Sequence, residues 1–343
     1  MNFASDNAYG AWPEIVAAIA AAASGAVPSY GDDALTQKIR NRLCDLFACD
    51  LAVFPVISGT AANALALATL VPPHGAVVCH REAHIAVDEC GAPEFFTHGA
   101  KLIALEGEGA KLAPDGVERA LAHFQKGFVH HVQPMALSIT QSTELGTVYT
   151  ADETKALSAL AHAHGMKVHM DGARFANALC RMGCTPAEAT WQAGIDVLSF
   201  GATKNGALGA EAVIFFHPED AGDFEYRRKK AGHLISKMRF VSAQLDAYLT
   251  GDRWLVRAGR ANALARRLAD GLGRIAGVEI AYPVEANAVF AWLPDAIAAG
   301  LRAKGAVFYD WGPPQGGRTL VRLVASFATP EEDVDRLLAA ANG

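Results

Sequence analysis

The chain contains 343 residues, of which 51% are hydrophobic and 19% charged, and its formal net charge is −6. This length and apolar content predict a globular protein with one large and one smaller domain, and exclude a disordered chain. The negative net charge offers no basic surface, so we expect neither a nucleic-acid partner nor a membrane partner. Met1–Asn7 lacks the basic region of a signal peptide, and we expect a cytoplasmic protein.

Short apolar strands alternate with longer helical stretches from residue 51 to about residue 216. The predicted strands are Leu51–Val56, Ala76–Cys79, Lys101–Leu105, Ala136–Thr140, Lys167–Met170, Val197–Phe200 and Glu211–Phe216. The predicted helices are Thr60–Val71, Asp115–Gln125 and Asp152–His164. This alternation predicts an α/β fold, in which helices sandwich a mostly parallel sheet. The last two strands follow one another without a helix, which predicts an antiparallel pair.

The pattern changes after about residue 217. Two long helices are predicted first, at Phe224–Leu249 and Trp254–Ile275. Strands are then predicted at Val278–Ile280, Ala288–Leu293, Val307–Tyr309 and Leu320–Val324, with helices at Ala296–Lys304 and Glu331–Ala341. We therefore expect an N-terminal arm at residues 1–15, a large domain at residues 16–250, and a smaller C-terminal α+β domain at residues 251–343.

Polar segments stand where strands of the predicted sheet end, which is where open α/β sheets bind ligands. The first is Ser58-Gly59-Thr60, between a strand and a helix. A glycine turn that leads into a helix presents free N–H groups and the positive end of the helix dipole, which suits a phosphate. An ordinary helix cap by Ser58 or Thr60 is the alternative.

The second segment contains Asp171, directly after a strand, and Arg174. Asp171 could accept a hydrogen bond from a cationic ring nitrogen of a cofactor. Arg174 could offer a planar pair of donors to a carboxylate or phenolate. The alternative is a helix N-cap by Asp171 with a solvated Arg174.

The third segment places Lys204 between small residues at a strand end, with Thr203 before it. Small neighbours allow a cofactor to approach closely, and a desolvated lysine is the nucleophile that forms Schiff bases. Thr203 could add a hydroxyl to a phosphate. In the fourth segment, His84 could stack on a flat ring and act as an acid or base. A solvated loop lysine and a polar loop histidine are the alternatives.

Other kinds of site lack their motifs. There is no G-x-x-x-x-G-K-[ST] and no G-x-G-x-x-G after the first strand, so a P-loop or dinucleotide site is not expected. The chain has no H-E-x-x-H, and its histidines are scattered, so we expect no metal. The six cysteines include no C-x-x-C pair and are expected to be reduced.

Taken together, these segments resemble the low-specificity L-threonine aldolases, in the aminotransferase-like, fold type I superfamily of pyridoxal 5'-phosphate (PLP) enzymes. The matching text is S-D-N at Ser5–Asn7, Y-G-D-D at Tyr30–Asp33, S-G-T-A-A-N at Ser58–Asn63, E-A-H at Glu82–His84, H-M-D-G-A-R at His169–Arg174, G-A-T-K-N-G at Gly201–Gly206 and S-K-M-R at Ser236–Arg239. Seven segments in the right order, nearly end to end, are more specific than any one. The resemblance implies a lyase that cleaves L-threonine, L-allo-threonine and related β-hydroxy-α-amino acids to glycine and an aldehyde.

The resemblance also implies roles for individual residues. Lys204 would carry PLP as a Schiff base, and Asp171 would pair with its ring nitrogen. His84 would stack on the ring. The remaining cofactor contacts would come from Ser58, Gly59, Thr60, Arg174, Thr203 and Arg239.

Substrate and subunit contacts follow from the same resemblance. Ser5, Arg174 and Arg322 would bind the substrate carboxylate. Lys229 and Arg239, on the predicted long helix, would reach the active site of a neighbouring subunit, and Tyr30 is a weaker candidate there. A homo-oligomer is implied, a dimer with shared sites and beyond it a homotetramer. A solvated basic helix face is the alternative for the two cations.

The chain departs from the family pattern at one position. Many relatives carry a histidine in an E-N-T-H-N segment that contacts the substrate hydroxyl. The corresponding stretch here is Thr140–Gly146, which has no histidine, and Glu144 is nearest by position. The group that takes the hydroxyl proton is therefore open between His84, Glu144 and a bound water.

Two alternative functions share some of these features. A PLP-dependent β-eliminating lyase or an aminotransferase would use the same fold and the same Lys204. A catalytically idle PLP- or phosphate-binding regulator would need fewer groups than Asp171, Lys204 and two arginines for a carboxylate. Product analysis separates the first alternative from an aldolase.

Overall fold

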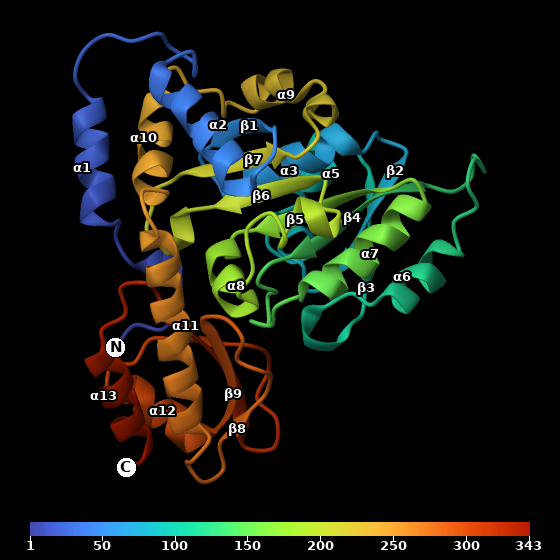
Figure 1. The fold of residues 1–343 in the computed structure, drawn as a ribbon. Helices are drawn as coiled ribbons and strands as arrows, with labels where there is room; N and C mark the ends of the chain where they lie inside the picture. The colour runs from blue at the N-terminus through green and yellow to red at the C-terminus, as the bar shows by residue number, and fades with distance from the viewer.

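The computed structural model describes residues 1–343 and contains two sheets (Figure 1). The larger sheet has seven strands in the order β1-β7-β6-β5-β4-β2-β3. These are β1 Ala52–Val56, β2 Gly75–His80, β3 Lys101–Leu105, β4 Gln133–Thr140, β5 Lys167–Gly172, β6 Val197–Gly201 and β7 Glu211–Phe215. Five neighbouring strands are parallel, and β7 runs antiparallel to both β6 and β1. The mostly parallel sheet and the antiparallel pair are both confirmed.

Thirteen α-helices surround the two sheets. They are α1 Pro13–Ala22, α2 Ala34–Phe47, α3 Gly59–Leu70, α4 His84–Val87, α5 Ala92–Phe96, α6 Pro114–Leu121, α7 Ala151–Ala163, α8 Phe175–Met182, α9 Phe224–Lys230, α10 Arg239–Tyr248, α11 Arg253–Leu272, α12 Asp295–Ala303 and α13 Glu331–Ala341. None of them combines the length and apolar character that a membrane span requires.

Alternate residues of the central strands pack against helices on opposite faces of the large sheet. Val197 and Val213 pack with α3 in one apolar cluster, whereas Leu198 and Ile214 belong to the largest cluster on the other face. This is the two-residue periodicity of a strand that is covered on both sides. The expected sandwich of helices around the sheet is confirmed.

The predicted long helix Phe224–Leu249 is wrong. Helix α9 ends at Lys230, and α10 begins only at Arg239. Gly232 ends the helical stretch, because it adopts φ +79°, which a helix does not allow. The cations in the last turn of α9 then lie at the end where the helix dipole stabilises them. Lys229 and Arg239 consequently lie on different elements.

The smaller sheet is antiparallel, in the order β10-β11-β9-β8. Its strands are β8 Glu279–Ile280, β9 Ala288–Pro294, β10 Tyr309–Asp310 and β11 Arg318–Val324. Phe3 from the N-terminal arm is fully buried in the apolar core of this unit. Helix α11 joins both cores, since Trp254 packs with the large sheet and Leu268 with the small one. The division at residue 250 remains our proposal.

Candidate active site

A cavity of about 400 Å³ lies at the carboxyl ends of the parallel strands. It is lined by 19 residues, and most of those that the sequence singles out are among them. The predicted residues in its wall are Ser58, Gly59, Thr60, His84, Glu144, Asp171, Arg174, Thr203 and Lys204. Segments that are far apart in the sequence thus meet at the edge of the sheet where ligands of this architecture bind.

One end of the cavity is the N-terminus of α3. Ser58 is the N-cap, and its hydroxyl accepts a hydrogen bond from the Ala61 N–H at 3.3 Å. The N–H groups of Gly59 and Thr60 have no partner within the protein. A side chain at Gly59 would enter open space, so nothing covers this end of the helix. The helix cap and the anion-binding surface therefore coexist, and the free N–H groups fit a phosphate.

Asp171 lies at the end of β5 and also lines the cavity. Its Oδ1 accepts the Ala173 N–H at 3.0 Å, and its Oδ2 accepts the Asn63 amide at 2.8 Å. It does not cap a helix, because α8 begins at Phe175 with Arg174 as its N-cap. The helix-cap alternative for Asp171 is thus wrong.

Arg174 is not solvated either. Its guanidinium donates two hydrogen bonds to Asp6, Nε to Oδ2 at 2.7 Å and Nη2 to Oδ1 at 3.0 Å. Burial alone would raise the pKa of Asp6, but the charge and hydrogen bonds of Arg174 outweigh burial and lower it. Nη1 of Arg174 has no protein partner and remains available on a residue that lines the cavity.

Lys204 stands in a short 3-10 turn, Thr203–Asn205, directly after β6. Desolvation in the cavity, and then the neighbouring Arg174, lower its pKa. The turn is fixed from outside by Gly206, which adopts φ +113°: a Cβ there would lie 1.8 Å from the Trp12 indole nitrogen. A lysine held in place with a lowered pKa has the properties of a nucleophile.

His84 begins α4, and its ring lies beside a buried carboxylate. Nδ1 is 2.8 Å from Oε1 of Glu89, whose side chain is fully buried. The hydrogen bond to Glu89 raises the pKa of His84, although burial opposes the shift. The backbone N–H of His84 donates to Glu144 at 2.9 Å. Two acidic residues therefore hold this histidine, one through its ring and one through its backbone.

Glu144 is the residue nearest by position to the histidine that many relatives carry, and it lines the cavity. Its Oε1 accepts from the His84 N–H and, at 2.8 Å, from the Thr140 hydroxyl. Its Oε2 is buried without any partner. Desolvation, and then the charge of Asp171, raise the pKa of Glu144 to about 7.

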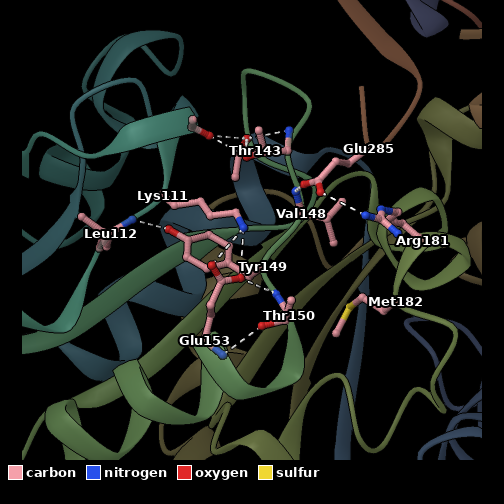
Figure 2. Close-up of polar contacts among 12 residues, drawn as sticks. Lys111, Leu112, Thr143, Val148, Tyr149, Thr150, Glu153, Arg181, Met182 and Glu285 are labelled. Carbon is pink, nitrogen blue, oxygen red and sulfur yellow. Dashed lines mark hydrogen bonds and ion pairs between the residues drawn. The ribbon is translucent and has the colours of Figure 1, made fainter. Parts of the chain in front are cut away.

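The irregular segment that carries Glu144, residues 141–150, forms hydrogen bonds with several distant parts of the chain, some of which Figure 2 shows. Tyr149 accepts the Leu112 N–H on its hydroxyl at 2.6 Å. Glu285, from the C-terminal unit, accepts the Val148 N–H at 2.8 Å and pairs with Arg181 at 3.3 Å. Thr143 and Thr147 donate to the Gly109 carbonyl, and the next helix begins with a capping box of Thr150 and Glu153. These contacts hold the Glu144 backbone in place.

Two predicted substrate residues lie next to the cavity but not in its wall. Ser5 caps a 3-10 turn by accepting the Asn7 N–H at 3.1 Å, and Asn7 lines the cavity. Arg322, on β11, donates to the Ala4 carbonyl at 3.3 Å, while its Nε is buried without a partner. Burial, and then the charge of Arg174, lower the pKa of Arg322.

Three predicted residues lie away from the cavity, on a separate surface. The Lys229 ammonium is 4.2 Å from the centre of the Tyr30 ring. Arg239 donates to the Gly25 carbonyl at 3.0 Å and lines a shallow pocket with residues 25–29. Within one chain, the structure does not bring these three side chains to Lys204.

Four acidic or amide residues of the site have no role in the sequence interpretation. They are Asp6, Asn63, Glu89 and Glu211. Asp6 and Asn63 lie within two of the segments that resemble the family. Asn63 could have been noticed as a lone amide in a helix of alanines and leucines. Glu211 opens β7, lines the cavity, and accepts the Ala202 N–H at 3.0 Å; burial raises its pKa to about 7. Nothing in its sequence neighbourhood indicates this position.

Comparisons with known proteins agree with this geometry. The family described as Beta-eliminating lyase matches residues 2–296. The low specificity L-threonine aldolase of a Pseudomonas species is 45% identical over 98% of this chain and 96% of its own length. That of Pseudomonas aeruginosa is 46% identical over 92% of this chain and 91% of its own.

Solved structures extend the likeness to the whole fold. A threonine aldolase of Leishmania major superposes with a TM-score of 0.93 at 27% identity, over 99% of this chain and 98% of the other. The serine palmitoyltransferase of Sphingomonas wittichii, at 15% identity and a TM-score of 0.71, shares the fold over 100% of this chain and 86% of its own. The resemblance inferred from the sequence is confirmed. The chain belongs to the beta-eliminating lyase family and, within it, to the low-specificity L-threonine aldolases.

Proposed function

We propose that the protein is a PLP-dependent aldehyde-lyase that cleaves L-threonine, L-allo-threonine and related β-hydroxy-α-amino acids to glycine and an aldehyde. One observation carries the proposal: a single cavity combines Lys204, Asp171 and the free N-terminus of α3. These are the three contacts that a phosphorylated pyridine aldehyde needs. The relatives that the chain matches over nearly its full length are named for this reaction.

The donor set fits the cofactor. Gly59 and Thr60 would hold its phosphate, with the Ser58 and Thr203 hydroxyls nearby, and Lys204 would hold it covalently. Asp171 would accept the ring N–H, and His84 would cover the ring. The buried and unpartnered oxygens of Glu89 and Glu144 show that this wall is short of hydrogen-bond donors. When bound, PLP withdraws electrons from the breaking Cα–Cβ bond.

The arginines would fix the substrate carboxylate. Asp6 occupies two donors of Arg174, which leaves Nη1, and Arg322 retains an unpartnered Nε. Two charge-assisted donors hold a carboxylate in one orientation. Such a clamp decides which bond at Cα lies perpendicular to the cofactor ring, a positioning effect worth up to about 7–11 kcal/mol in ideal cases. Ser5 would orient the arm beside this clamp.

We assign the β-hydroxyl proton to Glu144. Its Oε2 has no partner, and a pKa of about 7 lets the carboxyl accept and return a proton near neutrality. His84 is the competing group, but Glu89 holds its Nδ1. A water held by Glu144 would use the same carboxylate.

Product analysis tests the reaction itself. Purified protein is incubated with L-threonine, L-allo-threonine, D-threonine and L-phenylserine, and glycine, aldehyde, ammonia and 2-oxo acid are measured. Equimolar glycine and aldehyde from the L-substrates support the proposal. A β-eliminating lyase would instead release ammonia and 2-oxobutanoate from threonine, and an aminotransferase would form a 2-oxo acid only with an acceptor. Either result would replace the proposed reaction.

Assembly and location complete the proposal. We propose a homodimer in which Lys229, Arg239 and Tyr30 serve the partner's site, and a homotetramer of two such dimers, in the cytoplasm. Support comes from the separate cationic surface that these three residues form outside their own cavity. A closed two-fold assembly would make the contribution reciprocal.

A further inference from the structure

Asn63 is an amide in an unusual place, the middle of the apolar helix α3. The residues around it in this helix are alanine, leucine and threonine, and Asn63 itself is only 1% exposed. Burying an amide in such surroundings costs free energy unless its donors are used. Both N–H donors are used, and neither goes to another part of the helix, whereas the amide oxygen Oδ1 has no partner.

The two hydrogen bonds of Asn63 go to two different carboxylates. Its Nδ2 donates to Oδ2 of Asp171 and to Oε1 of Glu89, both at 2.8 Å. The same Oε1 of Glu89 lies 2.8 Å from Nδ1 of His84. An unbroken chain of three hydrogen bonds therefore connects Asp171 on β5 with His84 on α4, through Asn63 and Glu89, which also line the cavity.

An amide is the suitable group for this junction. A single NH2 group offers two donors, so it satisfies two carboxylates that would otherwise repel each other. An aspartate at position 63 would add a third negative charge beside Glu89 and Asp171, and a leucine of similar size would leave Oδ2 of Asp171 without its donor and Oε1 of Glu89 with His84 alone. Burial, and then the charge of Asp171, raise the pKa of Glu89, and the hydrogen bonds from His84 and Asn63 oppose this rise.

We propose that Asn63 and Glu89 are positioning residues that lock the Asp171 carboxylate and the His84 ring into one arrangement. The role rests on the proposed function, because it matters when a cofactor ring lies between these two groups. The hydrogen bonds themselves exist in the protein alone. Asn63 thereby couples the group that would face the ring nitrogen to the group that would cover the ring.

The hydrogen-bond chain predicts the direction in which the pKa of His84 changes when Asn63 is replaced. The charged groups that face this histidine are Glu89, Asp171, Lys204 and, through the backbone, Glu144. Removing the Asn63 donor destabilises the ionised form of Glu89, whose pKa then rises. A more protonated Glu89 supports the imidazolium less, so the pKa of His84 falls. The effect of Asn63 on His84 must therefore pass through Glu89.

A double-mutant cycle tests this on the full-length protein, with and without PLP. Asn63→Leu, Glu89→Gln and the double variant are compared by histidine-selective NMR titration, with the His84 signal assigned by His84→Asn. Each single variant should lower the pKa of His84 and weaken PLP binding about tenfold, the effect of one lost charge-assisted hydrogen bond. In the Glu89→Gln background, Asn63→Leu should not change the pKa of His84 further.

Asn177→Leu is the matched control, since it removes another buried asparagine, which bonds to Asn262 away from the cavity. It should lose stability without moving the His84 titration. Additive effects of Asn63→Leu and Glu89→Gln, or an Asn63→Leu titration like that of Asn177→Leu, would overturn the proposal. If Asn63→Leu does not fold, Glu89→Gln alone decides. A Glu89→Gln variant with the wild-type pKa of His84 and the wild-type PLP affinity would refute the proposal. Failure of the aldol reaction would leave all these readouts unaffected.

Discussion

Lys204 lies among the carboxylates of the cavity, and its chemistry can be tested by itself. Lys204→Ala should remove the covalent link to PLP, because no other lysine lines the cavity. Wild-type protein should be yellow and should bleach on borohydride treatment, and the variant should not. Peptide mapping of the reduced protein checks the assignment: a pyridoxyl group on any lysine other than Lys204 would refute it.

Glu144 should impose a pH dependence on the reaction. The carboxyl must be ionised to accept the β-hydroxyl proton, and burial and Asp171 raise its pKa to about 7. The rate should therefore rise with pH through about 7. Glu144→Gln should abolish this rise and lower kcat by about 10²–10⁴-fold, the usual value of a general base. A retained pH profile would assign the proton to His84 or to water.

The raised pKa of Glu144 should affect stability in the opposite direction: activity rises with pH, whereas the contribution of Glu144 to stability falls. In the folded state the pKa of Glu144 is raised from its ordinary 4.5 to about 7, so folding favours the protonated form. Its stabilising contribution is full below pH 4.5 and is lost as the pH rises to about 7. Glu144→Gln should therefore be more stable than the wild type above pH 7 and lose this advantage in acid. Thermal unfolding at pH 5 and pH 8 measures the difference, and a variant that is less stable at pH 8 would contradict it.

At the scale of elements, the segment 141–150 is the link between the C-terminal unit and Glu144. Glu285→Ala would leave the Val148 N–H without its acceptor and Arg181 without its partner. We expect a loss of about 1–3 kcal/mol in unfolding free energy, with a lower kcat and unchanged PLP affinity. Glu279→Ala is the matched control, because Glu279 forms an exposed ion pair with Arg318 that is worth about 0–1 kcal/mol. If the two variants changed the unfolding free energy and kcat equally, the segment would not position Glu144.

Elements were predictable from the sequence where local pattern decides them. All seven strands of the large sheet lie within a few residues of their predicted bounds, because apolar strands ended by polar or glycine residues are a local signal. The break between α9 and α10 was missed, since Gly232 inside a basic and apolar run is a weak signal against a helix. Lys204, Asp171 and the α3 N-terminus were found because each stands at a strand end.

Contacts between distant segments could not be predicted in the same way. Asp6 pairs with Arg174 across 168 positions of the chain, and Glu211 holds the backbone of the lysine turn from a neighbouring strand. Such pairings depend on the order of strands in the sheet, which places β7 beside β6 and packs α3 against both. Residue pattern gives the strands but not the side chains that the topology brings together.

At the scale of the whole molecule, the cavity and the cationic surface are separate in one chain. Tyr30 and Lys229 form a contact there, and Arg239 lines a pocket with residues 25–29. Lys229 and Arg239 lie on two separate helices, but the 25–30 segment connects the two regions. The Tyr30 N–H donates to the Ser236 carbonyl at 3.0 Å. A compact cationic surface outside its own site is what a reciprocal two-fold assembly would use.

Complementation between two inactive variants tests this shared site. Lys204→Ala removes the nucleophile from a chain's own cavity, and Arg239→Ala removes the cation that we propose for the partner's cavity. In a mixed dimer one site carries both defects and the other carries neither. Refolding equal amounts together gives about half mixed dimers, so about one quarter of wild-type activity should return. Because each variant alone stays inactive, any recovery requires a site built from both chains. No recovery despite mixed oligomers proven by differential tags, or a fully active monomer in sedimentation, would show instead that Arg239 acts only within its own chain.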